Sequence, residues 1–207
     1  MRSTRFSVSM IRRSSVSTTL RSAIPFSIRD CSRSPRMPIS KNSDQRPMPT
    51  NDQPARLEQW LAAEGFPLSD LEAVQANETT ALMRAARLGR ADIVALLIEQ
   101  GVDVNCLNAD QNPALWFACF SDSLPSIELL INAGANLNNQ NVNGATPLIF
   151  AASAGKTEVV QLLLQHGAST TPETLDGFAA LDSAATRPIL KLLRAAATNE
   201  TQPESTP

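Results

Sequence analysis

The chain repeats itself with a period of 33 residues. Three full copies align without gaps, at residues 80–101, 113–134 and 146–167. Leu82, Leu115 and Leu148 share one position of the repeat, and a fourth copy begins in phase at Leu181 but is three residues shorter. A unit of this length cannot bury its own apolar side chains, so stability must come from the stacking of neighbouring units. The period therefore predicts a repeat array.

The third copy contains the signals for two short helices and the turns around them. The Thr146 hydroxyl can cap the first helix, and the apolar residues of 159–164 give the second helix a face to bury. Gly167 can take the left-handed conformation that ends this helix. Asn-Gly at 143–144 and Asp-Gly at 176–177 favour tight turns, which predicts β-hairpin-like loops between repeats.

The segment NGATPLIFAASAGKTEVVQLLLQHGA resembles an ankyrin repeat in its T-P-L start, Ala-Ala pair, central glycine and V-V-x-L-L-L run. The resemblance extends over residues 76–197. It implies an all-α repeat solenoid, in which helix-turn-helix ankyrin repeats stack on one another and are joined by β-hairpin-like loops. Apolar segments at the two ends are expected to form helical caps.

The array has an expected division into caps and repeats. It comprises an N-terminal capping region at 54–75, ankyrin repeats at 76–108, 109–141 and 142–174, a truncated repeat at 175–197 and a disordered end at 198–207. In the capping region, Leu57, Trp60 and Leu61 fall on one face of a helix predicted over 54–66, which Gly65 would end. This apolar face would cover the open side of the first repeat.

The first fifty residues differ in composition from the rest. Residues 1–50 carry nine Arg and one Lys against two acids, a net charge of +8, whereas residues 51–207 carry eight basic and eighteen acidic residues, a net charge of −10. The segment lacks the apolar content that would offset its ordering entropy, so we expect a disordered Arg/Ser-rich tail. Two alternatives stay open. In the first, which we favour, translation starts at Met48, with Met37 as a further candidate start. In the second, the segment is an organelle transit peptide.

No motif predicts catalysis. Gly-Lys-Thr at 155–157 matches the end of a phosphate-binding loop, but Phe150 occupies the place of the upstream glycine, so we interpret it as a turn between helices. His166, the only histidine, has no metal-ligand or catalytic constellation around it. We expect Cys119 to pack in the core and Cys106 to be an inert loop thiol. The sequence thus predicts a protein that is not an enzyme, with no cofactor or metal site.

Three positions depart from the family pattern. Asn112 precedes Pro113 where Thr-Pro is usual, so we expect it to cap the first helix of the second repeat. Asp122 replaces the glycine of the neighbouring repeats and is expected to adopt a positive φ. Pro188 takes the same position in the fourth repeat, which puts the second helix of that repeat in doubt.

Two groups of side chains have competing interpretations. Phe117 and Phe150 share one repeat position, and we expect them to stack between repeats in the core rather than face a partner. Arg84, Arg87 and Arg90 recur at helical spacing, either as a basic stripe that contacts an acidic partner or as a solvated helix face. For Trp116 we also favour a place in the core over a role facing a partner.

The resemblance implies a non-catalytic protein–protein interaction module, an adaptor or regulator with a concave groove made of hairpin tips and first helices. Carried over by position, the expected contacts at the tips are Asn77, Thr79, Asp110, Asn112, Asn143, Ala145, Asp176 and Phe178. Those on the helices are Arg87, Leu88, Phe120, Ser121, Ser153 and Ala154. Phe120 and Phe178 stand out because aromatic residues at solvent-facing positions are frequent hot spots, and Arg87 ranks third.

Other functional classes are less well supported. Association with nucleic acid through the basic tail is the alternative function, but a charge of −10 over residues 51–207 would repel phosphates. The cysteines, Cys31 among them, show no disulfide or metal spacing, so we expect reduced thiols and a cytoplasmic location, or an organelle if residues 1–50 are a transit peptide. The sequence contains no apolar run of about 18 residues, so it predicts no membrane-spanning helix. A small groove favours one modest interface and a monomer.

Overall fold

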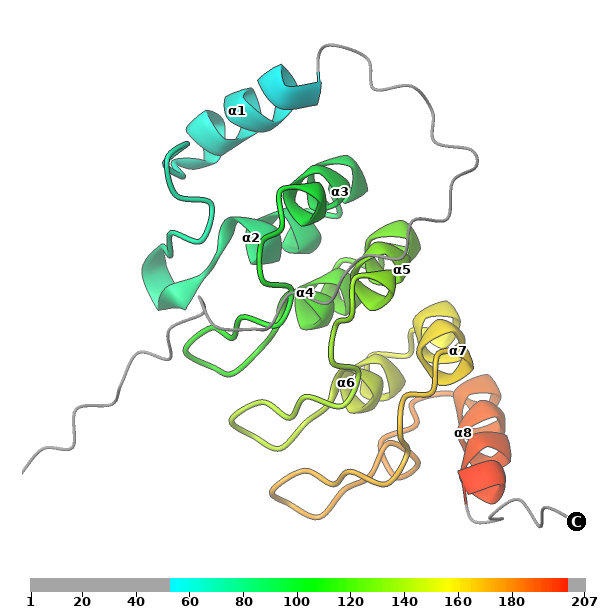
Figure 1. Cartoon of the computed structure of the whole chain (residues 1–207). Coiled ribbons are helices and arrows are strands. Elements are labelled where there is room, and N and C mark those ends of the chain that lie inside the picture. Colours follow the sequence, from blue (N-terminus) through cyan, green and yellow to red (C-terminus); the bar gives the residue numbers. More distant parts are fainter. Residues whose placement is uncertain (1–52, 201–207) are drawn as a thin grey trace, which may run out of the picture. The chain divides into compact units, whose positions relative to one another are not determined.

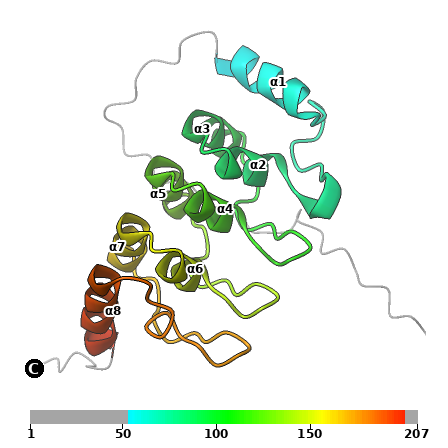
Figure 2. The same ribbon diagram turned by 180° about the vertical axis from the view of Figure 1, so that it is seen from behind.

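The helices of this protein come in consecutive pairs. The computed structural model describes residues 53–200, and the predictions for residues 1–50 lie outside them. Of the end at 198–207 that was expected to be disordered, residues 201–207 also lie outside them, whereas residues 198–200 belong to the last helix. The pairs are α2 (Ala81–Arg87) with α3 (Ala91–Glu99), α4 (Ala114–Phe120) with α5 (Leu124–Asn132), and α6 (Pro147–Ser153) with α7 (Thr157–Gln165). In Figures 1 and 2, α2, α4 and α6 follow one another in one row and α3, α5 and α7 in a second. The predicted all-α repeat solenoid is confirmed.

Repeated apolar positions form the core of this array. Leu82, Leu115 and Leu148 are all buried at the same position of successive repeats. Small side chains recur beside them at 85–86, 118–119 and 151–152, and every one is completely buried. Their size lets the helices of adjacent repeats approach closely and pack at the density of a protein interior.

The first helix of each repeat begins in one of two ways. Thr80 and Thr146 are the N-caps of α2 and α6, and each hydroxyl accepts a hydrogen bond from the backbone N–H three residues on. In the second repeat Pro113 occupies this position in the same extended conformation, without a side-chain cap. The prediction that Asn112 caps α4 is therefore wrong, because the 33-residue period places Asn112 one residue upstream of the capping position.

Hairpin loops connect the pairs, as expected for this fold class. Backbone N–H groups of residues 108, 141 and 174 donate to the carbonyls of residues 112, 145 and 178 at 3.0–3.1 Å. Successive loops are also joined tip to tip, because Ala109, Val142 and Leu175 donate to the carbonyls of residues 77, 110 and 143. We call this row of tip-to-tip bonds the hairpin ladder. It ties each repeat to the next on the side away from the second helices.

The helix α1 (Gln53–Glu64) caps the first repeat. It packs on α3 through the predicted face of Leu57, Trp60 and Leu61, which is buried. Gly65 follows the helix at φ +78°, in the left-handed region. A short 3-10 helix, Ala76–Glu78, then leads into the first repeat.

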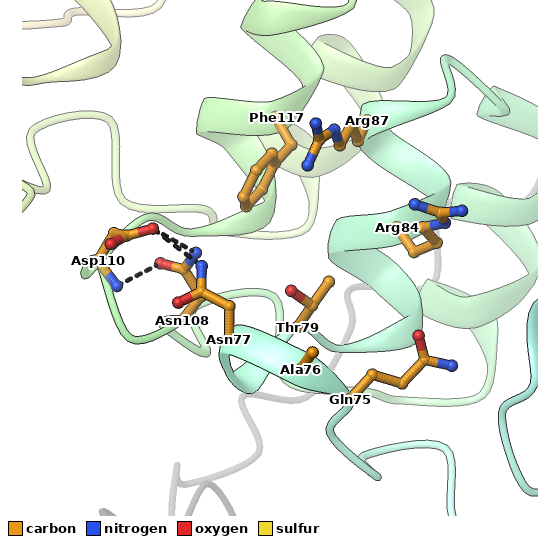
Figure 3. Close-up of a pocket in the computed structure, with 9 residues that line it drawn as sticks. All are labelled: Gln75, Ala76, Asn77, Thr79, Arg84, Arg87, Asn108, Asp110 and Phe117. Atoms are coloured by element: carbon orange, nitrogen blue, oxygen red, sulfur yellow. Dashed lines mark hydrogen bonds between the residues drawn. The ribbon is translucent and has the colours of Figure 1, made fainter.

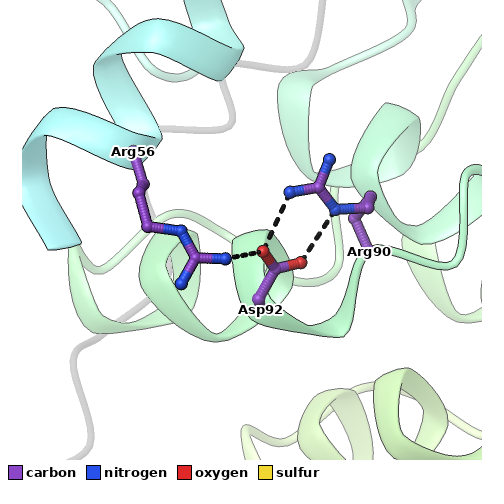
Figure 4. Close-up of polar contacts among 3 residues, drawn as sticks. All are labelled: Arg56, Arg90 and Asp92. Atoms are coloured by element: carbon purple, nitrogen blue, oxygen red, sulfur yellow. Dashed lines mark hydrogen bonds and ion pairs between the residues drawn. The ribbon is translucent and has the colours of Figure 1, made fainter. Parts of the chain in front are cut away.

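An ion cluster joins α1 to α3 (Figure 4). Asp92 at the start of α3 accepts from Arg56 of α1 at 2.6 Å and from Arg90 through both carboxylate oxygens at 2.9 Å. The hydrogen bonds from Arg90 lower the pKa of Asp92, and the charges of Arg90 and Arg56 lower it further against an opposing effect of partial burial. Because the pKa of Asp92 is lower in the folded state, its ion pairs stabilise the fold above the ordinary Asp pKa. This stabilisation is lost as pH falls through the lowered pKa.

The fourth repeat keeps its second helix and lacks its first. Residues 180–183 form turns, and the chain then enters α8 (Arg187–Glu200), which packs on α7 and buries Ile189 and Leu193. The doubt that Pro188 raised about this helix was misplaced. The three-residue deletion moves Pro188 from the glycine position into the first turn of α8, where its missing N–H costs no helical hydrogen bond.

The turn between α4 and α5 contains a non-glycine residue in the left-handed region, as predicted. Asp122 has φ +61°, close to the +66° and +75° of Gly89 and Gly155 at the equivalent turns. Its carboxylate lies 3.6 Å from the Lys156 ammonium in the next repeat. Within residues 53–200 no helix has the length and apolar character required to cross a membrane.

Candidate functional site

Hairpin tips and the exposed sides of α2, α4 and α6 lie on the same side of the array, and we call them together the inner face. A hollow of about 310 Å³ opens in this face between the first two hairpins and helices α2 and α4 (Figure 3). Its wall is made of Gln75, Ala76, Asn77, Thr79, Arg84, Arg87, Asn108, Asp110 and Phe117. Two arginines and an aromatic ring therefore stand opposite the amide and carboxylate groups of the tips.

Phe120 and Arg87 form an exposed cation–π pair beside this hollow. The side chain of Phe120, the last residue of α4, is 52% exposed. The guanidinium carbon of Arg87, the last residue of α2, lies 5.7 Å from the ring centroid. Such a contact contributes about 0.5–1 kcal/mol at an exposed site. It also holds the two side chains in place before any partner arrives.

Aromatic rings continue from Phe120 into the next repeat. The Phe150 ring lies 6.3 Å from that of Phe120 and 4.9 Å from that of Trp116, measured between centroids. Phe117 and Phe150 both pack against the core, as predicted, but the rings that lie against Phe150 are those of Trp116 and Phe120 and not that of Phe117. Phe117 is half-buried and lines the hollow instead. The result is a half-exposed row of rings that crosses the junction between the second and third repeats.

The basic stripe that was one of the two interpretations of Arg84, Arg87 and Arg90 does not form. Arg84 is paired with Glu64 at 2.7 Å, and Arg90 is held by Asp92. Helix α2 ends at Arg87, so Arg90 falls in the following turn and points to a different neighbour. Among the residues that the structure describes, only Arg87 of the three has no carboxylate partner.

Several of the tip residues expected to meet a partner also join the hairpins to one another. The Asn77 side-chain amide donates to the Asp110 carboxylate at 2.9 Å, and the Asn143 carbonyl accepts from Leu175. Asn77, Asp110 and Asn143 are nevertheless exposed. Asp176 and Phe178 in the last hairpin are exposed as well. The tips can therefore contact a partner without rearrangement.

Other expected contact residues are less accessible. Asn112 is only 9% exposed, and its Oδ1 is buried without a hydrogen-bond partner, so it is removed from the candidate surface. Ser121 is half-buried, because its hydroxyl donates to the Ala86 carbonyl of the preceding repeat at 2.8 Å. Thr79 and Ala145 are half-buried, whereas Leu88, Ser153 and Ala154 are exposed.

Sequence reasoning missed Leu175, whose side chain is 79% exposed at the tip of the fourth hairpin. The alignment of the repeats could have identified this residue. Ala76, Ala109, Val142 and Leu175 occupy one position, and the side chain grows toward the C-terminal end of the array. A large aliphatic residue at a solvent-facing tip position is a candidate contact in the same way as an aromatic one.

The described residues offer little for catalysis. No group of three His, Cys, Asp or Glu side chains in residues 53–200 is arranged to hold a metal ion. Gly-Lys-Thr at 155–157 is the turn between α6 and α7, with Gly155 in the left-handed region, as the sequence indicated. His166 is exposed at the C-terminal end of α7.

Cys119 is expected to resist alkylation while the protein is folded. It is completely buried, and burial raises the pKa of its thiol to about 12, a rise that the charge of Lys156 opposes and that of Asp122 supports. Because the thiolate is the reactive form, iodoacetamide at about pH 8 should modify Cys119 only after unfolding. Mass spectrometry of samples labelled with and without urea would measure this, and equal labelling of Cys119 in both would contradict it.

Comparison with known proteins agrees with this architecture. A family model described as "Ankyrin repeats (3 copies)" matches residues 51–141 and 115–203. No curated protein matches the chain.

Proposed function

Because the chain belongs to the ankyrin repeat family, we propose that it is a non-catalytic binding module that holds or regulates a partner protein on its inner face. Ankyrin repeats generally mediate protein–protein interactions, and the family is typically non-enzymatic. The observation that carries the proposal is the exposed pair of Phe120 and Arg87. We further propose that the module acts as a cytoplasmic monomer.

Phe120 supports this proposal because of its exposure to solvent. A phenylalanine that is half exposed on a helix loses the free energy that its burial would contribute, and a partner that covers it recovers that free energy. Arg87 brings a charge that no described carboxylate neutralises. Aromatic residues and arginine are also enriched among the few residues that dominate binding energy at interfaces.

The surrounding inner face sets the scale of the interaction. The hollow beside Arg87 and the row of rings at Trp116 and Phe150 adjoin the pair on its two sides. The exposed tips of Asn77 and Asp110 border the hollow. Because these features adjoin the pair, we propose one partner and an interface of modest size.

The double variant Phe120→Ala, Arg87→Glu is expected to lose its partner and keep its fold. Loss of a hot-spot pair costs about 2 kcal/mol or more in binding, which weakens affinity by a factor of about 30. Both side chains are exposed, so the thermal unfolding midpoint should change little. The measurement is affinity capture from native lysate on the wild-type chain and on the variant, followed by mass spectrometry.

A matched control is the variant Leu68→Ala, Lys191→Glu. It removes an equally exposed apolar side chain and reverses one charge, but on the N-terminal loop and on α8. Capture of the same proteins by the wild type and by the Phe120 and Arg87 variant would sink the proposal. A third bait lacking residues 1–47 separates the alternative function, because binding through the basic tail would not survive that truncation.

A further inference from the structure

Asn143 and Gly144 are the only Asn-Gly pair in the chain, and they lie at the tip of the third hairpin. In such a pair the backbone nitrogen of the glycine can attack the side-chain amide of the asparagine, because glycine has no Cβ atom to block the approach. The product is a cyclic imide, which water opens to aspartate or isoaspartate. Asn143 is exposed, whereas Gly144 is buried. The pair therefore combines a reactive sequence with a constrained backbone.

The peptide group between these two residues is hydrogen-bonded at both of its polar ends. Its N–H, on Gly144, donates to the Asn141 carbonyl at 2.8 Å, and its C=O, on Asn143, accepts from the Leu175 N–H at 3.0 Å. Attack on the Asn143 side chain requires this peptide group to rotate and its N–H to lose the proton. Rotation breaks both hydrogen bonds, and loss of the proton breaks the first of them. The closed hairpin therefore opposes the reaction.

The fourth hairpin also packs directly on Gly144. A Cβ atom added to Gly144 would lie 2.9 Å from the Leu175 backbone nitrogen, so the two backbones are in contact. Gln140 joins the same two hairpins, because its side-chain amide donates to the Gly144 carbonyl and to the Glu173 carbonyl, each at 2.8 Å. The fourth hairpin thus covers the reactive pair of the third.

This junction lies at the end of the array, where separation of two hairpins requires the least disruption. A terminal repeat contacts only one neighbouring repeat. In the fourth repeat residues 180–183 form turns, in the place of the first helix of the other repeats. Segments of this kind open locally at a lower free energy than global unfolding requires. The hairpins can therefore separate while the core of the array stays folded.

We propose that Asn143 is a deamidation site that the fourth hairpin holds closed, and that it reacts when the third and fourth hairpins separate. In the open state a bond forms between the Gly144 nitrogen and Cγ of Asn143, and the bond from Cγ to the side-chain nitrogen breaks. That nitrogen leaves as ammonia with the proton of the Gly144 N–H. Water then adds to one of the two imide carbonyls and opens the ring. No group is oxidised or reduced.

The products weaken the closed hairpin. Isoaspartate carries the main chain through its former side-chain carbon, which adds one backbone atom beside the carbonyl that accepts from Leu175. Both products also add a negative charge at Asn143, next to a hairpin that already exposes Glu173 and Asp176. Deamidation therefore leaves a permanent record that this junction has opened. This modification goes beyond the function proposed above and does not depend on it.

The test follows deamidation of Asn143 in the full chain by peptide mass spectrometry, at mildly alkaline pH, with and without urea. The folded chain is expected to react at least about tenfold more slowly than the unfolded chain. Gln140→Ala removes the amide that joins the two hairpins, so it should speed the reaction of the folded chain about fivefold. The matched control, Gln161→Ala, removes the same group from an exposed position on α7 and should leave the rate unchanged. Circular dichroism shows whether both variants fold.

Hydrogen exchange at the Leu175 N–H measures the separation of the hairpins independently. Low concentrations of urea that leave the fold intact should raise this exchange rate and the deamidation rate of Asn143 by the same factor. If Gln140→Ala does not fold, this urea series alone decides. Equal deamidation rates in the folded and unfolded chain would overturn the proposal. A deamidation rate that follows exchange of core amides such as that of Leu115, and not exchange at Leu175, would overturn it as well.

Discussion

Replacing Leu115 with alanine is expected to lower the free energy of unfolding by about 3 kcal/mol. Leu115 is completely buried in the second repeat, between the equivalent Leu82 and Leu148 of its two neighbours. The substitution removes apolar contacts and leaves a cavity that the stacked helices on both sides cannot close without moving. Because each repeat depends on its neighbours for burial, damage in the middle of the array weakens two junctions at once.

The same substitution at Leu175 is the matched control for this prediction. Leu175 is 79% exposed, so Leu175→Ala should change stability by less than about 0.5 kcal/mol. Urea unfolding followed by circular dichroism gives both values, and the urea dependence of the unfolding free energy shows whether the compactness of either state has changed. Equal effects of the two substitutions would mean that the core does not run through Leu115.

Replacing Gly144 with alanine is expected to destabilise the protein by about 3 kcal/mol. Gly144 has φ +75°, a region in which a Cβ atom is strained. An added Cβ would also lie 2.9 Å from the Leu175 backbone nitrogen and 3.1 Å from Thr174. The nitrogen of Leu175 donates to the Asn143 carbonyl, so relief of this contact would pull the fourth hairpin away from the third.

Gly177→Ala separates the two causes of this expected loss. Gly177 is the equivalent residue of the next hairpin, with φ +78° and nothing within 4 Å of an added Cβ. The substitution Gly177→Ala should therefore lower the free energy of unfolding only by the strain of the left-handed conformation, about 1 kcal/mol. Thermal and urea unfolding of the two variants measure the difference. If both variants lose the same stability, contact between successive hairpins contributes nothing.

Local backbone requirements could be predicted from the sequence because they depend on few residues. Thr146 caps α6 with its own hydroxyl, and Asp122 adopts a positive φ in the turn where the neighbouring repeats have glycine. The capping face of Leu57, Trp60 and Leu61 followed from helical periodicity alone. The prediction for Asn112 failed because the capping position of α4 is Pro113, which the 33-residue period aligns with Thr80 and Thr146.

Contacts between repeats could not be predicted in the same way. Phe117 and Phe150 share a repeat position, but the rings that lie against Phe150 are those of Trp116 and Phe120. The arginines were spaced for one helix, yet the helix ends at Arg87 and acids from other elements take Arg84 and Arg90. Equal spacing along the chain does not specify neighbours across a junction.

The sequence by itself determined the period and the positions of the helices in the three full repeats, because these depend on spacing and on local conformation. Only the tertiary structure decided which polar and aromatic side chains face solvent. Among the described residues, it left Arg87 without a carboxylate partner beside Phe120, and it left Leu175 exposed at the tip of the fourth hairpin. Both outcomes depend on which residues the stacked array brings together across its junctions.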